Sequence, residues 1–199
     1  MKIGFILECG PMGADKKVHT LLAKRVQPSI EIDAVTLDDK KKLIAGCGAA
    51  ARVLLKTCHR VLVIWDLYPA WRQRGELPCR HTDRLAAFAS LDAARVPRGR
   101  VTLVCIDAEL ETWLIADERA VKAVLTKLKS PHPLGTIVAK QKRPESNTNP
   151  KRTLERWFKA ETGRSYIDRD HAHQIAAAIP NLSRLRDLAT FSRFTANLR

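Results

Sequence analysis

Four short apolar segments that alternate with helical patterns constrain the fold of this chain more than any other feature of its sequence. The apolar segments are Ile3–Leu7, Ile32–Leu37, Val61–Trp65 and Val101–Ile106. Three of them are continuous apolar runs, which is typical of strands that are covered on both faces. Helical patterns lie between them, at Lys16–Val26, Asp39–Thr57 and Thr82–Ala94. This alternation predicts βαβ crossovers and an α/β fold with an open, mainly parallel four-stranded sheet flanked by helices.

The second part of the chain differs in character from the first. A helix is expected around Leu110–Val121, and residues 129–153 are then rich in Pro, Ser, Asn and basic residues, which indicates a long loop. Two or three helices should follow, at Lys151–Glu161, Asp168–Ile179 and Leu182–Phe194. Asp168, or Ser165 before it, is the expected N-cap of the middle one. We therefore expect an α/β domain at residues 1–128, with a basic loop and a small helical C-terminal extension packed on it at residues 129–199.

Positive charge is concentrated in this second part. The formal net charge is +14, of which residues 1–120 carry +4 and residues 121–199 carry +10. Such a balance points to an acidic partner such as nucleic acid, a nucleotide or a membrane surface. Five residues of the loop are candidates for contacts with the phosphates of a nucleic acid: Lys140, Lys142, Arg143, Lys151 and Arg152. The alternative is a charged loop that is merely solvated.

Carboxylates follow three of the four apolar segments. Glu8 follows the first segment, Asp66 the third, and Glu109 and Glu111 come shortly after the fourth. Because ligands of open α/β sheets bind at the carboxyl ends of the strands, we expect these acids at one edge. In an extended chain Glu109 and Glu111 share a face, whereas in a helix they point about 200° apart and only one could serve the site. The pattern leaves both arrangements open, and a single acid after a strand more often caps a helix or faces solvent.

A cluster of carboxylates at one edge predicts a divalent metal. Neighbouring carboxylates repel one another and raise each other's pKa. A cation removes that repulsion, and oxygen ligands suit Mg²⁺ or Mn²⁺. The candidate metal ligands are Glu8, Asp66 and Glu111, and Glu109 joins them as a candidate catalytic residue.

The cysteines and the hydropathy pattern bear on where the protein acts. The chain has five cysteines with no repeated spacing, which argues against a disulfide framework and favours a reducing cytoplasm. No apolar run approaches the roughly 18 residues of a membrane span, and the apolar start of the chain is too short for a signal peptide. We therefore expect a cytoplasmic protein without a membrane partner.

Two sets of motifs resemble known families. Glu8, Gly10 and Pro11 after the first apolar segment, with Asp66 after the third, resemble the Toprim domain of topoisomerases, primases and the overcoming-lysogenization-defect (OLD) nucleases. The stretches "ELETWLIAD" (109–117) and "RLRDLATFSRF" (184–194) resemble the bacterial domain-of-unknown-function family 4276, a Toprim-like group. This second resemblance covers most of the chain, although its motifs are short.

The resemblance implies roles for the same acids. Glu8 matches the Toprim Glu, and Asp66 matches the first Asp of the Asp-x-Asp that helps to hold Mg²⁺ for phosphoryl transfer on nucleic acid. Glu109 and Glu111 match the Glu-x-Glu that precedes a Trp in family 4276, whose members often look to be encoded beside ATPases in phage-defence or other mobile loci. Tyr68 departs from the pattern, because Toprim has its second Asp there, and Asp15 could stand in for a later acid of the first turn.

Two functions of different classes follow from these observations. The first is metal-dependent, nuclease-type cleavage of DNA or RNA in a phage-defence or mobile-element system with a partner ATPase. The second is a non-catalytic subunit that binds nucleic acid or a partner protein and keeps a degenerate acidic site, a hypothesis that Tyr68 in place of an acid sustains.

Overall fold

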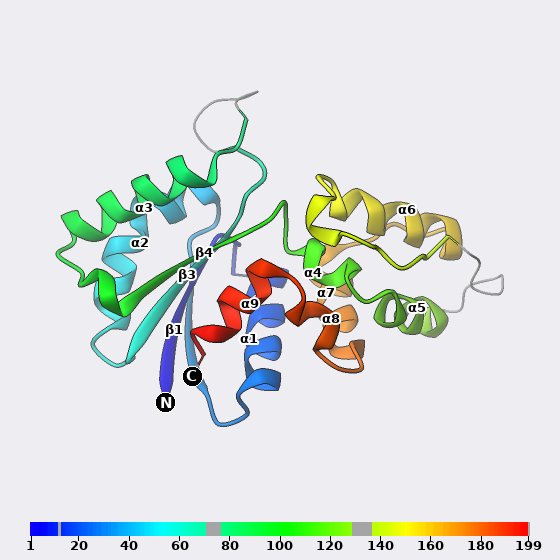
Figure 1. Cartoon of the computed structure of the whole chain (residues 1–199), viewed down its shortest axis with the longest axis horizontal. Helices are drawn as coiled ribbons and strands as arrows, with labels where there is room; N and C mark the ends of the chain where they lie inside the picture. The colour runs from blue at the N-terminus through cyan, green and yellow to red at the C-terminus, as the bar shows by residue number, and fades with distance from the viewer. Residues whose placement is uncertain (12, 71–76, 129–136, 199) are drawn as a thin grey trace.

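A four-stranded sheet forms the centre of the protein (Figure 1). The computed structural model of the chain describes residues 1–11, 13–70, 77–128 and 137–198. The strands are β1 (Lys2–Leu7), β2 (Glu31–Thr36), β3 (Arg60–Asp66) and β4 (Val101–Ile106). They lie in the order β2-β1-β3-β4, and every neighbouring pair is parallel. The predicted α/β class and the open parallel sheet are therefore confirmed.

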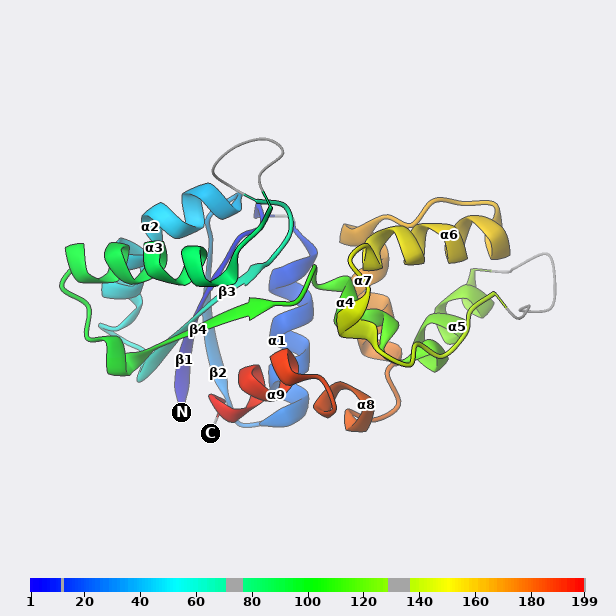
Figure 2. The same cartoon turned by 45° about the horizontal axis from the view of Figure 1, so that its top comes forward.

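Helices cover both faces of the sheet (Figure 2). One face packs against α2 (Lys40–Leu54) and α3 (Arg80–Ala93), and the residues between them form one hydrophobic cluster. The other face packs against α1 (Ala14–Val26) and α9 (Ala189–Ala196), which belong to a second and larger cluster. Coverage on both faces explains why β1, β3 and β4 are almost wholly apolar.

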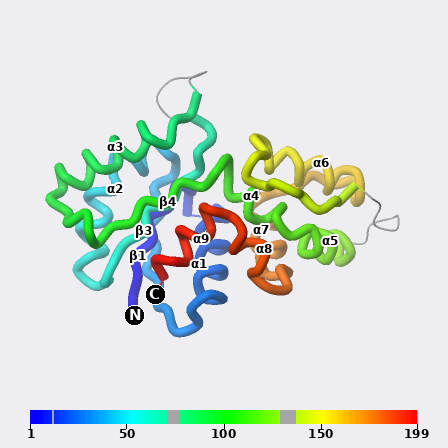
Figure 3. Tube along the Cα trace, viewed as in Figure 1, coloured from blue at the N-terminus to red at the C-terminus, as the bar shows by residue number. Residues whose placement is uncertain are grey.

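The remaining helices gather beside the sheet in both views of the chain (Figures 1 and 2). They are α4 (Glu111–Ile115), α5 (Glu118–Lys127), α6 (Pro150–Thr162), α7 (Asp168–Ala178) and α8 (Ser183–Arg186). Short 3-10 turns occur at Arg98–Arg100 (η1) and Pro144–Ser146 (η2). Helix α7 contacts both α1 and α5, and α9 returns to β4, so both ends of the chain lie on the same side of the molecule (Figure 3).

The C-terminal helices share a hydrophobic core with the sheet. Phe5 of β1 and Phe194 of α9 have ring centroids 5.9 Å apart, and Trp113 of α4 packs at 5.3 Å from Phe194. The expected boundary between residues 128 and 129 falls at the start of segment 129–136, which lies outside the described residues. The segment after it, from residue 137 to α6, is a loop interrupted by η2.

Two of the expected helices are wrong in the same way, because each is two shorter helices. The helix expected around Leu110–Val121 breaks before α5, where the Asp117 carboxylate caps that helix by accepting from the Arg119 backbone N–H at 3.1 Å. The helix expected at Leu182–Phe194 breaks at Leu188, whose backbone is extended (ψ 128°). The N-cap of α7 is Ile167 rather than Asp168 or Ser165, and Asp168 is the first helical residue.

The structure bears on two expectations from the sequence, namely the state of the cysteines and the presence of a membrane span. All five cysteines carry free thiols, and four of them are buried. Among the helices in the described part of the chain, none is both long and apolar enough to cross a membrane.

Candidate functional site

Glu8 and Asp66 come to the same edge of the sheet because their strands are neighbours. In the parallel β1–β3 pair Leu7 lies opposite Ile64, so Glu8 and Asp66 both follow at the carboxyl edge. The two acids interact, because the charge of Glu8 raises the pKa of Asp66 and the Asp66 backbone forms a hydrogen bond with the Glu8 carboxyl. Both residues are partly buried, and burial is strong enough at their carboxyl groups to raise the pKa of each.

Two further acids join this edge from helices. Glu111 is the first residue of α4 and is 5% exposed, and Asp15 lies in the first turn of α1. The negative charges of Glu8, Asp15 and Glu111 all raise the pKa of Asp66, which shows that the four carboxylates share one electrostatic environment. We call Glu8, Asp15, Asp66 and Glu111 the acidic edge.

Burial, rather than mutual repulsion, is the main reason why the pKa values of Glu8, Asp66 and Glu111 are raised. Burial raises the pKa of Glu8 to about 8 and that of Glu111 to about 7, and it raises the pKa of Asp66 well above its usual value. The neighbouring negative charges add to this effect in each case. The pKa values are therefore raised as expected, but desolvation is the larger cause and repulsion the smaller.

The choice between Glu109 and Glu111 is decided by the turn that precedes α4. Ala108 has a φ of 59°, and α4 begins only three residues later, so the two acids are not on one extended face. Glu111 belongs to the acidic edge, whereas the Glu109 carboxylate accepts from the Lys151 backbone N–H at 3.4 Å, at the start of α6. Burial raises the pKa of Glu109, and the Lys151 amide and ammonium lower it.

Tyr166 forms a hydrogen bond with the Glu111 carboxylate. Its hydroxyl donates to Glu111 Oε1 at 3.2 Å, and both side chains are 5% exposed. Burial raises the pKa of Tyr166, and the neighbouring Glu111 raises it further. Because Tyr166 follows α6 in the chain, 55 residues after Glu111, the sequence offered no spacing that would have linked the two.

Lys40 is a second residue at this edge that the sequence analysis missed. Its ammonium donates to the carbonyl oxygens of Leu67 at 2.6 Å and Pro69 at 2.7 Å, and it lies 3.4 Å from Asp83. Its charge also lowers the pKa of Glu8, against the larger effect of burial. A signal did exist, because a lysine in the first turn of a helix opposes the helix dipole and so calls for another explanation.

The acidic edge fits a hard divalent cation by its donors, although its side chains do not form a closed set of ligands. Among the residues that the structure describes, no three His, Cys, Asp or Glu side chains are grouped closely enough to hold a metal ion. Within the described ranges, the oxygen Glu8 Oε2 is buried without a hydrogen-bond partner, although a backbone hydrogen bond from Asp66 to this carboxyl lowers its pKa. A buried oxygen of this kind costs free energy unless it is paired, and a cation would satisfy it.

A cleft gives access to Glu8 from one side. It has a volume of about 400 Å³ and is lined by residues from the β2–α2 turn and from the segment after β3. Glu8 contributes to its wall together with Asp38, Asp39, Lys40 and Pro69. Lys40 therefore both lines this cleft and holds the segment that forms its opposite wall.

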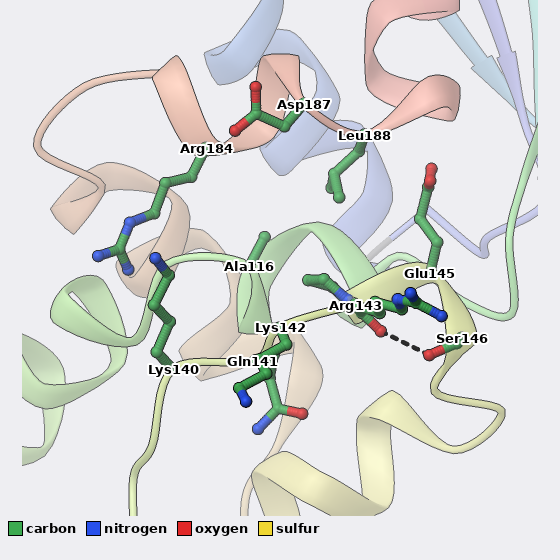
Figure 4. Close-up of a pocket in the computed structure, with 11 residues that line it drawn as sticks. Ala116, Lys140, Gln141, Lys142, Arg143, Glu145, Ser146, Arg184, Asp187 and Leu188 are labelled. Atoms are coloured by element: carbon green, nitrogen blue, oxygen red, sulfur yellow. Dashed lines mark hydrogen bonds between the residues drawn. The ribbon is translucent and has the colours of Figure 1, made fainter.

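The structure does not bring together all five basic residues of the loop. Lys140, Lys142 and Arg143 line one cleft, and Arg184 of α8 joins them there (Figure 4). Arg152 lines a different cleft with Asn147, Asn149, Thr153 and Arg156. Lys151 is engaged elsewhere, because its ammonium lies 3.0 Å from the Asp168 carboxylate. The five basic residues therefore lie in three separate environments, a division that the order of residues in the sequence could not reveal.

Comparison with known proteins places the chain in a family. No curated protein and no solved structure matches it. A family model described as a domain of unknown function (DUF4276) matches residues 12–199. The match includes Asp15, Asp66, Glu109 and Glu111, and it begins just after Glu8. Because it covers most of the sequence, the chain belongs to the DUF4276 family.

Proposed function

We propose that this protein is a metal-dependent nuclease, in which the acidic edge performs phosphoryl transfer on a nucleic acid. The observation that carries the proposal is that three separate parts of the chain deliver Glu8, Asp66 and Glu111 to one electrostatic environment. Buried carboxylates with raised pKa values destabilise a fold and are found more often at functional sites than elsewhere. The net charge of +14 supports a nucleic-acid partner.

The residues of the chain would divide the work as follows. Glu8, Asp66 and Glu111 would hold Mg²⁺ or Mn²⁺, which when bound polarises a phosphoryl oxygen and lowers the pKa of a bound water. Tyr166 donates to Oε1 of Glu111, so that Oε2 of the same carboxylate would be the oxygen available to a cation. Lys40 fixes Leu67 and Pro69, which keeps the segment after Asp66 in place beside Glu8.

The same acids carry the resemblance to the Toprim domain. Glu8 and Asp66 stand at the ends of adjacent parallel strands, as the resemblance implies for the Toprim Glu and Asp. The members that this chain resembles often look to be encoded beside ATPases in phage-defence or other mobile loci. We therefore propose that the protein acts in the cytoplasm, within a phage-defence or mobile-element system that includes an ATPase partner. The five free thiols agree with a reducing compartment.

A second function is favoured by a specific observation. Tyr68 stands where the Toprim pattern has an acid, and its backbone N–H donates to the Ala108 carbonyl at 3.0 Å, so its position is determined by the end of the sheet. With a tyrosine in place of that acid and no closed set of ligands in the described residues, the edge would suit a subunit that binds nucleic acid or a partner without cleaving it.

Metal binding and cleavage measured together separate the two functions. Asp66→Asn should abolish nuclease activity in Mg²⁺ or Mn²⁺ and weaken Mn²⁺ binding in calorimetry, because the variant removes a charged ligand while keeping the shape of the side chain. The matched control is Glu31→Gln, an exposed acid at the amino end of β2 that should leave both measurements unchanged.

Two results would count against the nuclease. Equal Mn²⁺ binding by the wild type and Asp66→Asn would remove Asp66 from the site. Binding of nucleic acid by the wild type without cleavage at any concentration of either metal would favour the non-catalytic subunit instead.

A further inference from the structure

A second cleft, of about 570 Å³, lies away from the acidic edge and is lined by a different set of residues. Its walls come from the end of α4, from the loop at residues 140–146 and from α8 with the residues that follow it (Figure 4). We call it the cationic cleft, after Lys140, Lys142, Arg143 and Arg184. Glu111 starts α4 and Ala116 follows its end, so a residue of the acidic edge and a residue of the cationic cleft are about 7.5 Å apart along the axis of this short helix.

Three of the four cations are available for a ligand. Lys140, Lys142 and Arg143 are exposed, and no acidic side chain in the described part of the chain forms an ion pair with them. Unpaired cations that converge on a concave surface bind anions better than the same charges spread over a convex one, because the low-dielectric walls focus their field.

The fourth cation is held in place by acids behind it. Arg184 forms an ion pair with Glu118 and lies 3.5 Å from Asp117. In Figure 4 it lies with Lys140 at one end of the cleft, whereas Arg143 and Ser146 lie at the other end. Arg184 is therefore a positioned donor whose charge is partly balanced.

The acids of the cleft do not cancel this charge. Glu145 Oε1 accepts from the Thr190 backbone N–H at 3.1 Å and from the Thr190 hydroxyl at 3.2 Å, so this carboxylate is used to hold the start of α9. The Asp187 carboxylate lies across the cleft from Lys142 in Figure 4. Within the described ranges, Lys140, Lys142 and Arg143 thus have no acidic partner of their own.

The loop that carries the cations is held in its shape. The Ser146 backbone N–H and hydroxyl both donate to the Arg143 carbonyl, at 3.1 and 2.8 Å, and the Gln141 amide donates to the Ala139 carbonyl at 3.3 Å. These bonds lie within the loop itself, so binding would need to order fewer groups and would cost less entropy. The cleft is in this sense preorganised.

We propose that the cationic cleft binds a nucleotide unit through its phosphate groups. The volume of about 570 Å³ falls within the range of roughly 300–1,000 Å³ for small-molecule sites, so it admits a nucleotide, whereas a duplex could only lie across its mouth. Lysine and arginine donors match phosphate oxygens, and four such side chains line this one cleft. This inference rests on the proposed function: if the protein cleaves nucleic acid, the cationic cleft would bind that nucleic acid as a single strand.

Binding in the absence of metal tests the cleft without relying on cleavage. The probes are a fluorescein-labelled single-stranded oligonucleotide, the blunt duplex of the same sequence and ATP as a free nucleotide, all in EDTA and at several salt concentrations. The cleft variant is Lys142→Ala/Arg143→Ala. The control is Arg52→Ala/Lys56→Ala, which removes the same two residue types from exposed positions in and just after α2.

The wild type should bind the single strand more tightly than the duplex. The cleft variant should weaken single-strand binding at least about tenfold, since each charged hydrogen bond contributes about a factor of ten or more. It should also reduce the slope of log K against log salt by about 1.4, at roughly 0.7 per phosphate contact on a single strand. The control should keep the affinity and slope of the wild type. ATP should be tested as a competitor of the single strand. If ATP competes with the strand for the wild type but not for the cleft variant, then the cationic cleft also binds a free nucleotide.

The results also separate this inference from the proposed function. The proposal that the cationic cleft binds a nucleotide would be wrong if the cleft variant bound the single strand as tightly as the wild type. It would also be wrong if the cleft variant and the control lost the same amount of affinity. Metal-dependent cleavage that persists alongside such a result would leave the nuclease standing. If the cleft variant loses nucleotide binding and the wild type cleaves nothing in any metal, the binding role of the cleft is supported and the proposed nuclease activity is contradicted.

Discussion

At the scale of single residues, Asp117 shows how one carboxylate holds two segments together. Its side chain is wholly buried, and Arg119 donates to both of its oxygens, at 2.8 and 2.6 Å. Arg184 of α8 lies 3.5 Å away, so the same carboxylate links the start of α5 to α8. Burial raises the pKa of Asp117, but the hydrogen bonds and charges of the arginines outweigh it and hold the pKa below its usual value.

Asp117→Asn should therefore destabilise the protein by about 2 kcal/mol at neutral pH, because it leaves two arginines without their shared partner. A folded pKa below the unfolded value of 3.8 means that this contribution is present above pH 3.8 and is lost as the pH falls through the folded value. Urea unfolding at neutral and acid pH should show the difference between wild type and variant shrinking in acid.

Asp92→Asn is the matched control for that measurement. Asp92 also pairs with an arginine, Arg98, but both side chains are more than half exposed. Solvent screens such a pair, so its loss should change the free energy of unfolding little. A loss of stability in Asp117→Asn that is no larger than in Asp92→Asn would show that the buried network does not hold α5 and α8 together.

At the scale of elements, the closest approach between two helices depends on Gly48. A Cβ built on Gly48 of α2 would lie 2.0 Å from the Ser90 carbonyl oxygen of α3, which is backbone and cannot rotate away. The Ser90 hydroxyl accepts from the Gly48 backbone N–H at 3.1 Å and donates to the Ala45 carbonyl at 2.8 Å. The two helices are thus in contact at the backbone.

Gly48→Ala should lower the free energy of unfolding by about 1–3 kcal/mol, because α2 and α3 must move apart to admit the methyl group. Gly46→Ala, two residues earlier, is the control, since its Cβ would meet only Leu37 Cδ1 at 3.5 Å. There the gain in helix propensity, up to about 1 kcal/mol, should leave the protein as stable as the wild type or more so. Equal melting temperatures for the two variants would contradict the close packing.

At the scale of the whole molecule, α9 joins the C-terminal helices to the sheet. Phe194 is wholly buried and contacts Phe5 of β1, Trp113 of α4 and Phe191. Trp113 is fixed in turn by its indole N–H, which donates to the Thr190 hydroxyl at 3.0 Å. Residues from both ends of the sequence therefore form one core.

Phe194→Ala should cost about 3–5 kcal/mol, the usual range for removing a buried Phe, and should lower the stability of the sheet and the helices in a single transition. Denaturation followed by far-ultraviolet circular dichroism and by tryptophan fluorescence tests both points. Arg193→Ala, at the partly exposed neighbouring position, is the control. Two separate transitions, with the sheet retaining the stability of the wild type, would show that the C-terminal helices fold as an independent unit.

The sequence by itself determined the layout of the sheet. The predicted segments matched all four strands to within one residue at each end. For β1, β3 and β4 the reason is that strands covered on both faces must be almost entirely apolar. Placing Glu8 and Asp66 at one edge needed only the parallel direction of the strands. Helix ends were less predictable, because the breaks at Asp117 and Leu188 depend on contacts with distant residues such as Arg184 and Glu145.

Only the tertiary structure decided which side chains meet. Glu111 rather than Glu109 joins Asp66, because Ala108 adopts a left-handed turn that periodicity does not encode. Tyr166 and Lys40 reach the acidic edge from positions that share no spacing with it. Arg184 completes a cleft with Lys142, while Lys151 and Arg152 leave that group. The physical reason is common to all of these cases: hydrophobic patterning orients each element towards the core, whereas polar contacts form between residues that only the packing of the elements brings together.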